Sequence, residues 1–136
     1  MEFIPYKKIG DYQFGEPIQN MFPDLDYENN QYILSKKYSI DDEETGILYK
    51  FGNGYFTQLH IDLPIYKDKV LFLGKDLTDE GQMDLIINNE EYIERRGYWV
   101  FPKIGLVISK DKEELFFFDE SLLQNWLLVH RPITSW

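Results

Sequence analysis

The stretch GILYKFGNGYFTQLHIDL, residues 46–63, decides the fold of this chain. At its centre, Gly52-Asn53-Gly54 joins residue types that tolerate a positive φ, as the tight turn of a hairpin requires. On both sides of this turn the residues are mostly β-branched or aromatic, and such residues favour strands. The stretch therefore predicts a hairpin that pairs a strand over 46–51 with a strand over 55–63.

The second of these strands alternates between two sets of side chains. Phe56, Gln58, His60 and Asp62 form one set, and the residues between and beside them, from Tyr55 to Leu63, form the other. Because successive side chains of a strand point to opposite faces, this alternation predicts one buried face and one wetter face. It also predicts that His60 shares a face with Gln58 and Asp62.

A second hairpin is predicted towards the C-terminus. Lys110-Asp111-Lys112 interrupts two runs of apolar residues, 104–109 and 114–118, and would form the turn that joins them.

Helical signals are fewer than strand signals and predict three short helices. Residues 78–89 place Met83, Ile86 and Ile87 at i, i+3 and i+4, with Asp76 and Thr78 as candidate caps. Glu16-Pro17 would open a helix through Phe22, with proline in the first turn. The third helix is predicted over 121–129, with Asp119 as its cap and with Leu122, Leu123, Trp126 and Leu127 packed inward.

The two halves of the sequence resemble each other at an offset of 59 residues. The matching positions are Gly15 and Gly74, Asn29-Asn30 and Asn88-Asn89, and Gly46-Ile47 and Gly105-Leu106. This echo predicts a β-α-β-β-β pattern that occurs twice, over 6–66 and 67–118, and is followed by the C-terminal helix 119–129. A chance match of common residue types is the alternative interpretation. Either way we expect a single domain over 1–136, because each half is small for a stable fold. The predicted class is α+β, with a largely antiparallel sheet and two or three short helices.

Composition narrows the classes of function. The chain has 136 residues, a net charge of −10 and no cysteine. Its acidity argues against binding to nucleic acid or to anionic membranes, since both would repel it. The missing cysteines exclude disulfides, thiolate catalysis and cysteine-bound metal. No basic N-terminal stretch precedes an apolar segment, so we expect a cytoplasmic protein. We also expect that the protein has no cofactor.

The candidate catalytic and ligand-binding motifs match the known sequence patterns of such sites only weakly. His60 and Asp62 could begin a catalytic triad, yet no serine stands close in sequence, and an exposed strand histidine explains them as well. His130-Arg131 suits the negative end of the last helix. Asp24-x-Asp26-x-Glu28 resembles a calcium loop but fails at positions six and twelve. The glycines at 52 and 54 lie in a hairpin and not between a strand and a helix, so no phosphate loop is predicted.

The strongest functional signal is a concentration of negative charge. Residues 11–44 contain 9 acidic and 2 basic side chains. Such a surface can attract a basic protein, and tyrosines among the charges can serve as anchors. A solvated region that keeps the protein soluble is the alternative. The predicted partner-binding residues are Asp24, Asp26, Tyr27, Glu28, Tyr32, Asp41, Asp42, Glu43 and Glu44.

This profile of a small, acidic, cysteine-free and aromatic-rich α+β chain resembles the immunity proteins of bacterial toxin systems, including contact-dependent growth inhibition. The resemblance implies binding to a cognate, often basic, toxin domain and no catalytic residues. In outline the predicted duplication is also similar to tandem-repeat inhibitors such as the β-lactamase inhibitory protein. Those inhibitors are secreted and contain cysteine, in contrast to the features expected here.

Other classes of function remain open on the sequence. The chain could be a scaffold or adaptor subunit of a complex, or a domain that binds a small molecule between sheet and helices. An enzyme is a further alternative, with His60 and Asp62 as its candidate pair. We expect the binding protein because the sequence has an acidic stretch and no recognisable catalytic constellation.

Overall fold

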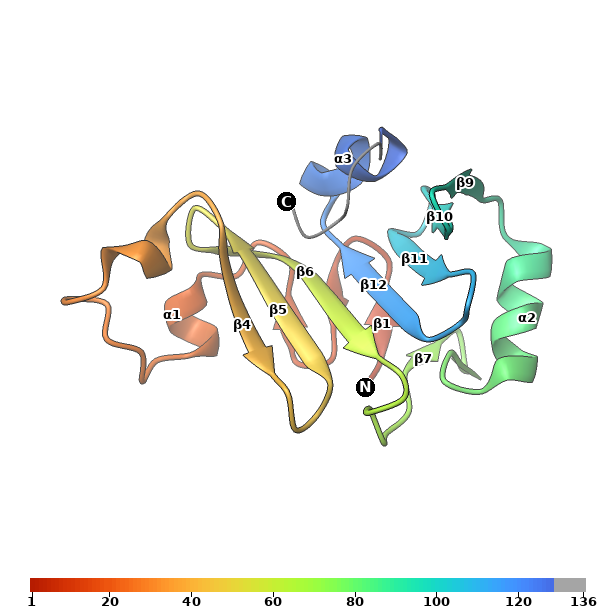
Figure 1. The fold of residues 1–136 in the computed structure, drawn as a ribbon, viewed down its shortest axis with the longest axis horizontal. Coiled ribbons are helices and arrows are strands. Elements are labelled where there is room, and N and C mark those ends of the chain that lie inside the picture. Colours follow the sequence, from red (N-terminus) through yellow and green to blue (C-terminus); the bar gives the residue numbers. More distant parts are fainter. Residues whose placement is uncertain (129–136) are drawn as a thin grey trace.

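The computed structural model describes residues 1–128 and has the predicted α+β class. Its centre is a seven-stranded antiparallel sheet with the order β4-β5-β6-β12-β11-β10-β9 (Figure 1). The strands of this sheet are β4 (Tyr38–Asp42), β5 (Ile47–Gly52), β6 (Tyr55–Asp62), β9 (Ile93–Arg95), β10 (Tyr98–Phe101), β11 (Leu106–Ser109) and β12 (Glu114–Phe118).

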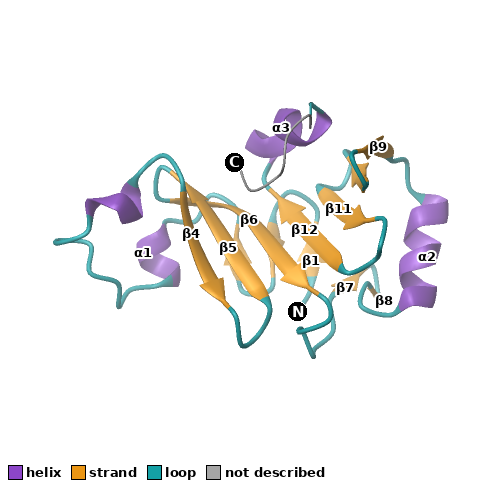
Figure 2. Ribbon diagram, viewed as in Figure 1, coloured by secondary structure: helices purple, strands orange, loops and turns teal. Residues whose placement is uncertain are grey.

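Smaller elements surround this sheet. Strands β1 (Phe3–Ile4), β2 (Lys8–Ile9) and β3 (Tyr12–Gln13) form a three-stranded sheet, and β7 (Leu71–Phe72) pairs with β8 (Lys75–Asp76). The helical segments are α1 (Ile18–Met21), η1 (Gln31–Leu34), α2 (Glu80–Asn89), η2 (Glu120–Leu122) and α3 (Leu123–Leu127). Figure 2 shows the helices at the two ends of the main sheet and beside its middle strands. None of the helices within residues 1–128 has the length and apolarity needed to cross a bilayer.

Both predicted hairpins are present. Asn53 and Gly54 have φ values of 52° and 83° and close the turn between β5 and β6. Two successive positive φ values characterise the two-residue turns that match the twist of a hairpin. The second hairpin joins β11 to β12, and Lys112, with a φ of 61°, lies in its turn.

The predicted alternation in β6 holds only after Thr57. The register between β5 and β6 shifts there, so Phe51 lies opposite Phe56 while Lys50 lies opposite Gln58. Such a bulge inserts one extra residue and reverses the faces on one side of it. Phe56 therefore enters the same core as Leu59, and the prediction that it shares a face with Gln58 is wrong.

The three helices lie close to their predicted positions, with differences at their ends. Helix α2 begins after Asp79, whose side chain accepts from the Gln82 N–H, so Asp79 and not Asp76 or Thr78 is its cap. Pro17 occupies the N-cap position of α1, immediately before the first turn and not within it. Asp119 caps a 3-10 turn that leads into α3, and the predicted end at Val129 lies outside the described residues.

The main sheet separates two apolar clusters. The larger lies on the face covered by the N-terminal strands, where the rings of Phe3 and Phe117 are 4.6 Å apart. The smaller lies on the opposite face, where α3 buries Trp126 against Phe116 and Phe118. Packing on both faces explains why β11 and β12 read as continuous apolar runs.

The two halves of the chain meet at the pairing of β6 with β12. Each half contributes a three-stranded meander, β4-β5-β6 or β10-β11-β12, and β5 and β11 begin at Ile47 and Leu106, 59 residues apart. Gly46 and Gly105 precede these strands with φ values of 76° and 70°. The second half also contains β9, a strand that the predicted pattern lacks. One continuous sheet therefore runs through both halves.

Candidate functional site: the open face of the sheet

The predicted acidic residues divide into two groups in the structure. Those at positions 24–28 belong to the loop between α1 and η1, and Tyr32 belongs to η1 itself, at the left end of the molecule in Figure 1. Asp41 and Asp42 form the other end of β4, and Glu43 and Glu44 lie in the turn that leads to β5. The length of β4 separates the two groups, so they do not form one continuous patch.

In the first group, Asp26 and Tyr27 have structural contacts. The carboxylate of Asp26 accepts from the side chain of Asn29 at 3.0 Å and from its main-chain N–H at 3.1 Å. These hydrogen bonds, led by the side-chain one, lower the pKa of Asp26. The hydroxyl of Tyr27 donates to the main-chain oxygens of Phe22 and Ile18. Both residues thus hold the loop in shape.

The remaining members of the first group are directed to solvent. Asp24 and Glu28 are exposed, and Tyr32 has 79% of its surface accessible. Leu34 is also exposed, and one of its methyl groups would lie 3.0 Å from a Cβ at Gly54. This end of the molecule therefore combines exposed apolar and acidic groups beside the β5–β6 turn.

In the second group the side chains divide between the turn and the sheet. Glu43 and Glu44 are exposed in the turn. Asp42 accepts from the main-chain N–H of Thr45 at 3.4 Å and helps to close that turn. Asp41 points to the other face of β4, because it pairs with Leu48 of β5 and through it with His60 of β6.

We call this face of β4, β5 and β6 the open face. Its side chains are directed away from the larger core, and α3 covers the neighbouring part over β12. The register places the following residues on it: Ser39, Asp41, Leu48, Lys50, Gln58, His60 and Asp62. As predicted, His60 shares its face with Gln58 and Asp62.

An acidic recess of about 460 Å³ occupies the lower part of the open face. Asp41, Glu43 and Asp62 provide carboxylates around it, and Leu48 and Ile65 provide apolar wall. Lysine and arginine bury an apolar stem and present a charged end, so a recess of this composition matches them. Only the tertiary structure brings Asp62 to Asp41, since they lie on different strands.

His60, beside this recess, is held by contacts that sequence reasoning missed. Its Nε2 lies 3.1 Å from Oε1 of Glu114, which belongs to β12, and its ring stacks on Phe116 at 4.2 Å with an interplanar angle of 5°. The expected pairing with Asp62 is thus replaced by a contact 54 positions away. The apolar run at 114–118 was the available signal, because it predicts a buried strand that pairs with another.

Burial governs the protonation of this pair. It lowers the pKa of His60 to about 4, and the charge of Lys50 acts in the same direction. Burial also raises the pKa of Glu114, as do Asp111 and Asp62. At neutral pH the imidazole is therefore neutral.

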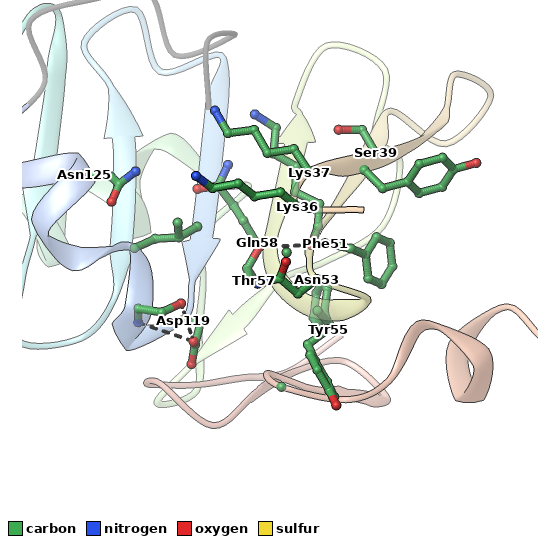
Figure 3. A pocket seen from close by; sticks show the side chains of 17 residues that line it. Lys36, Lys37, Ser39, Phe51, Asn53, Tyr55, Thr57, Gln58, Asp119 and Asn125 are labelled. Atoms are coloured by element: carbon green, nitrogen blue, oxygen red, sulfur yellow. Dashed lines mark hydrogen bonds between the residues drawn. The ribbon is translucent and has the colours of Figure 1, made fainter. Parts of the chain in front are cut away.

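A second cavity, of about 490 Å³, lies at the upper part of the open face (Figure 3). Lys36, Lys37 and Lys50 line it together with Gln58 and Asn125, the last of these from α3. The sequence shows the pair Lys36-Lys37, but only the fold brings Lys50 beside it. This basic site in a chain of net charge −10 was not predicted.

Within residues 1–128, no three histidine, aspartate or glutamate side chains are grouped as they would be around a metal ion. His130 and Arg131, expected at the end of the last helix, lie outside the described residues. Comparisons of the chain with protein-family models, with curated proteins and with solved structures find no match.

Proposed function

We propose that this protein binds a basic protein partner and neutralises it, as an immunity protein neutralises its cognate toxin domain. The observation that carries the proposal is the acidic recess, in which carboxylates of Asp41, Glu43 and Asp62 surround the apolar side chains of Leu48 and Ile65. A lysine or arginine of the partner would place its stem on the apolar wall and its charge among the carboxylates.

The surroundings of the recess support this mode of binding. Glu44 extends the negative charge along the β4–β5 turn, and Glu114 adds a further carboxylate beside Asp62 on the neighbouring strand. A negative field at an exposed edge accelerates encounter with a positive partner and disfavours partners of like charge. The exposed Tyr32, at the other end of β4, is a candidate anchor for a partner large enough to span both groups.

The first experiment is an affinity purification from the native host with the whole chain as bait. We expect a basic toxin domain to co-purify and to lose its activity when the chain is added. Recovery of a stable partner without toxic activity would favour the scaffold or adaptor function, and recovery of no basic protein would overturn the proposal.

The second experiment tests the recess itself by the kinetics of binding to the recovered partner. Replacing Asp41→Asn together with Glu43→Gln should slow association about tenfold at low salt and flatten its salt dependence, because both charges act on the encounter. Asp11→Asn with Glu90→Gln changes the net charge equally, outside both acidic groups, and should leave association close to wild type. Asp24→Asn with Glu28→Gln tests the first group in the same way. If the recess variant and the variant Asp11→Asn with Glu90→Gln associate at equal rates, the recess is excluded as the binding site.

A further inference from the structure

The main sheet ends in two edge strands, β4 and β9 (Figure 1). Strand β9 has only three residues, and the Nε–H of Arg95 at its end donates to the main-chain oxygen of Leu127 in α3 at 2.8 Å. Strand β4 has five residues, and within residues 1–128 no further strand pairs with its outer side. An edge of this kind presents unpaired main-chain groups to which another chain can add a strand.

The hydrogen bonds of β5 determine which groups of β4 face outward. The main-chain oxygens of Gly46 and Lys50 both accept hydrogen bonds from β6, so the even-numbered residues of this stretch direct their main chain towards β6. Ser39 and Asp41 lie opposite Lys50 and Leu48. The N–H and C=O groups of Ser39 and Asp41 are therefore directed away from β5, at the outer edge, and both residues are exposed.

The side chains of β4 determine which strand fits this edge. Residues directly opposite each other in an antiparallel pair share a face of the sheet. A residue added opposite Asp41 would therefore lie on the open face, beside the recess that Asp41, Glu43 and Asp62 make acidic. Its neighbour in sequence would lie on the other face beside Ile40, which packs partly buried against the larger core. The edge thus matches a strand in which basic and apolar residues alternate.

Charge also decides between a foreign strand and a second copy of this chain. Asp41 and Asp42 lie on the edge itself, and Glu43 and Glu44 follow them. A second β4 would bring the same acidic stretch to this edge, and charges on an edge strand oppose pairing between like edges. A positively charged strand is attracted by the same residues.

We propose that the basic partner binds by adding an extended segment to β4 as an eighth, antiparallel strand, with lysine or arginine at alternate positions over the acidic recess. The antiparallel direction continues the main sheet, in which every neighbouring pair is antiparallel. Main-chain hydrogen bonds would supply affinity, and the alternate side chains would supply specificity. This inference rests on the proposed function and deepens it, because it states how the partner binds.

The first test uses the whole chain and a synthetic peptide, acetyl-Thr-Val-Lys-Val-Lys-Val-Thr-amide, at low salt. The two lysines would lie opposite Ser39 and Asp41, with the central valine beside Ile40. We expect saturable ¹H–¹⁵N shifts at millimolar peptide and slower hydrogen exchange at the amides of Ser39 and Asp41. The amide of Ile40 faces β5 and serves as the internal reference, since its hydrogen bond exists without the peptide.

Two N-methylated forms of this peptide separate strand addition from simple charge attraction, because they have the same charge and composition. Methyl groups on the two lysine amides would face β4 and remove hydrogen bonds to it, so binding should weaken by at least about tenfold. Methyl groups on the two C-terminal valine amides would face outward and should change binding by less than about threefold. Equal binding of both forms, the reverse order, or no saturable shift with the parent peptide overturns the proposal.

A pair of protein variants tests the same edge from the other side. Ser39→Pro removes an outward N–H without removing a β4–β5 hydrogen bond, and proline is tolerated at such an edge position. It should weaken peptide binding about tenfold, whereas Ser39→Ala keeps the N–H and should bind like wild type. A dispersed spectrum establishes that each variant is folded, and if Ser39→Pro does not fold, the two N-methylated peptides decide.

The same variants distinguish failure of this inference from failure of the proposed function. A basic partner recovered from the host that binds Ser39→Pro as tightly as Ser39→Ala overturns strand addition and leaves the proposed function in place. Conversely, strand addition by the peptide is supported, and the proposed function alone fails, if the peptide binds as expected but no basic protein is recovered.

Discussion

The imidazole ring of His60 lies flat on the ring of Phe116 and contacts Glu114 at one edge. In isolation a histidine beside carboxylates would be expected to gain a proton, because opposite charge favours the charged form. Here burial acts more strongly, and it lowers the pKa to about 4. The protonation state of His60 is therefore determined by its burial, which depends on how the two halves pack together.

This protonation predicts a pH-dependent stability. The ordinary pKa of His60 is 6.5 and the folded value is about 4, so between these values the unfolded chain binds more protons than the folded one. The contribution of His60 is present above pH 6.5 and is lost as the pH falls towards 4, by about 3 kcal/mol. Urea unfolding across this range should show a shallower loss of stability in His60→Gln than in wild type.

Glu114 serves as the control for that measurement. Its raised pKa gives a contribution of opposite sign, which increases stability as the pH falls through the folded value. Glu114→Gln should therefore steepen the loss of stability on acidification, whereas His60→Gln reduces it. Identical pH profiles for wild type and His60→Gln would show that the histidine is protonated equally in both states.

At the scale of the elements, the turns between strands show which backbone positions require glycine. Gly105 begins the approach to β11 with a φ of 70°, and an added Cβ would lie 2.9 Å from the Tyr6 ring and 3.0 Å from the main-chain oxygen of Phe118. Gly74, in the β7–β8 turn, has a similar φ of 78°, but an added Cβ would meet no atom within 4 Å. A side chain at Gly74 would therefore cause backbone strain alone, whereas a side chain at Gly105 would cause the same strain and a steric clash as well.

We predict that Gly74→Ala destabilises the protein by about 1 kcal/mol, the cost of a side chain in the left-handed region. Gly105→Ala should cost about 3 kcal/mol or more, because the main-chain oxygen of Phe118 belongs to β12 and cannot move without disturbing the sheet. Chemical denaturation of the two variants measures the difference. Equal losses would mean that the contact at Gly105 relaxes.

For the whole molecule, the pairing of β6 with β12 joins the two halves into one sheet. Leu59 lies opposite Phe117, and Phe3, from the first half, packs on Phe117 from the second. Much of the apolar surface of each half is thus buried by the other. Small folds have little excess stability with which to tolerate the loss of such an interface.

We expect residues 1–66 expressed alone to be largely unfolded, because β6 would become an exposed apolar edge and Phe3 would lose its partner. Mixing this fragment with residues 67–136 should restore the circular dichroism and dispersed NMR spectrum of the whole chain. A cooperative unfolding transition of the isolated fragment would contradict this prediction and would establish the first half as an independent fold.

Local features of the sequence determined the elements of this protein. The turn at Asn53-Gly54, the strands beside it and the helix α2 were predictable, because positive φ, strand periodicity and helix periodicity act between near neighbours. The negative charge at 24–44 was equally visible. Its division into two groups was not, since that depends on which end of β4 each residue occupies.

Only the tertiary structure decided which residues meet on the open face. His60 contacts Glu114 across 54 positions, and Gln58 contacts Trp126 across 68. Both contacts depend on the partner and register of β6, and an alternating strand is compatible with any antiparallel neighbour. The basic cavity likewise takes residues from both halves of the chain, whereas the acidic recess is lined by residues 41–65 of neighbouring strands. The sequence therefore specifies which chemical groups the molecule has, while the packing of distant strands specifies which of them form a site.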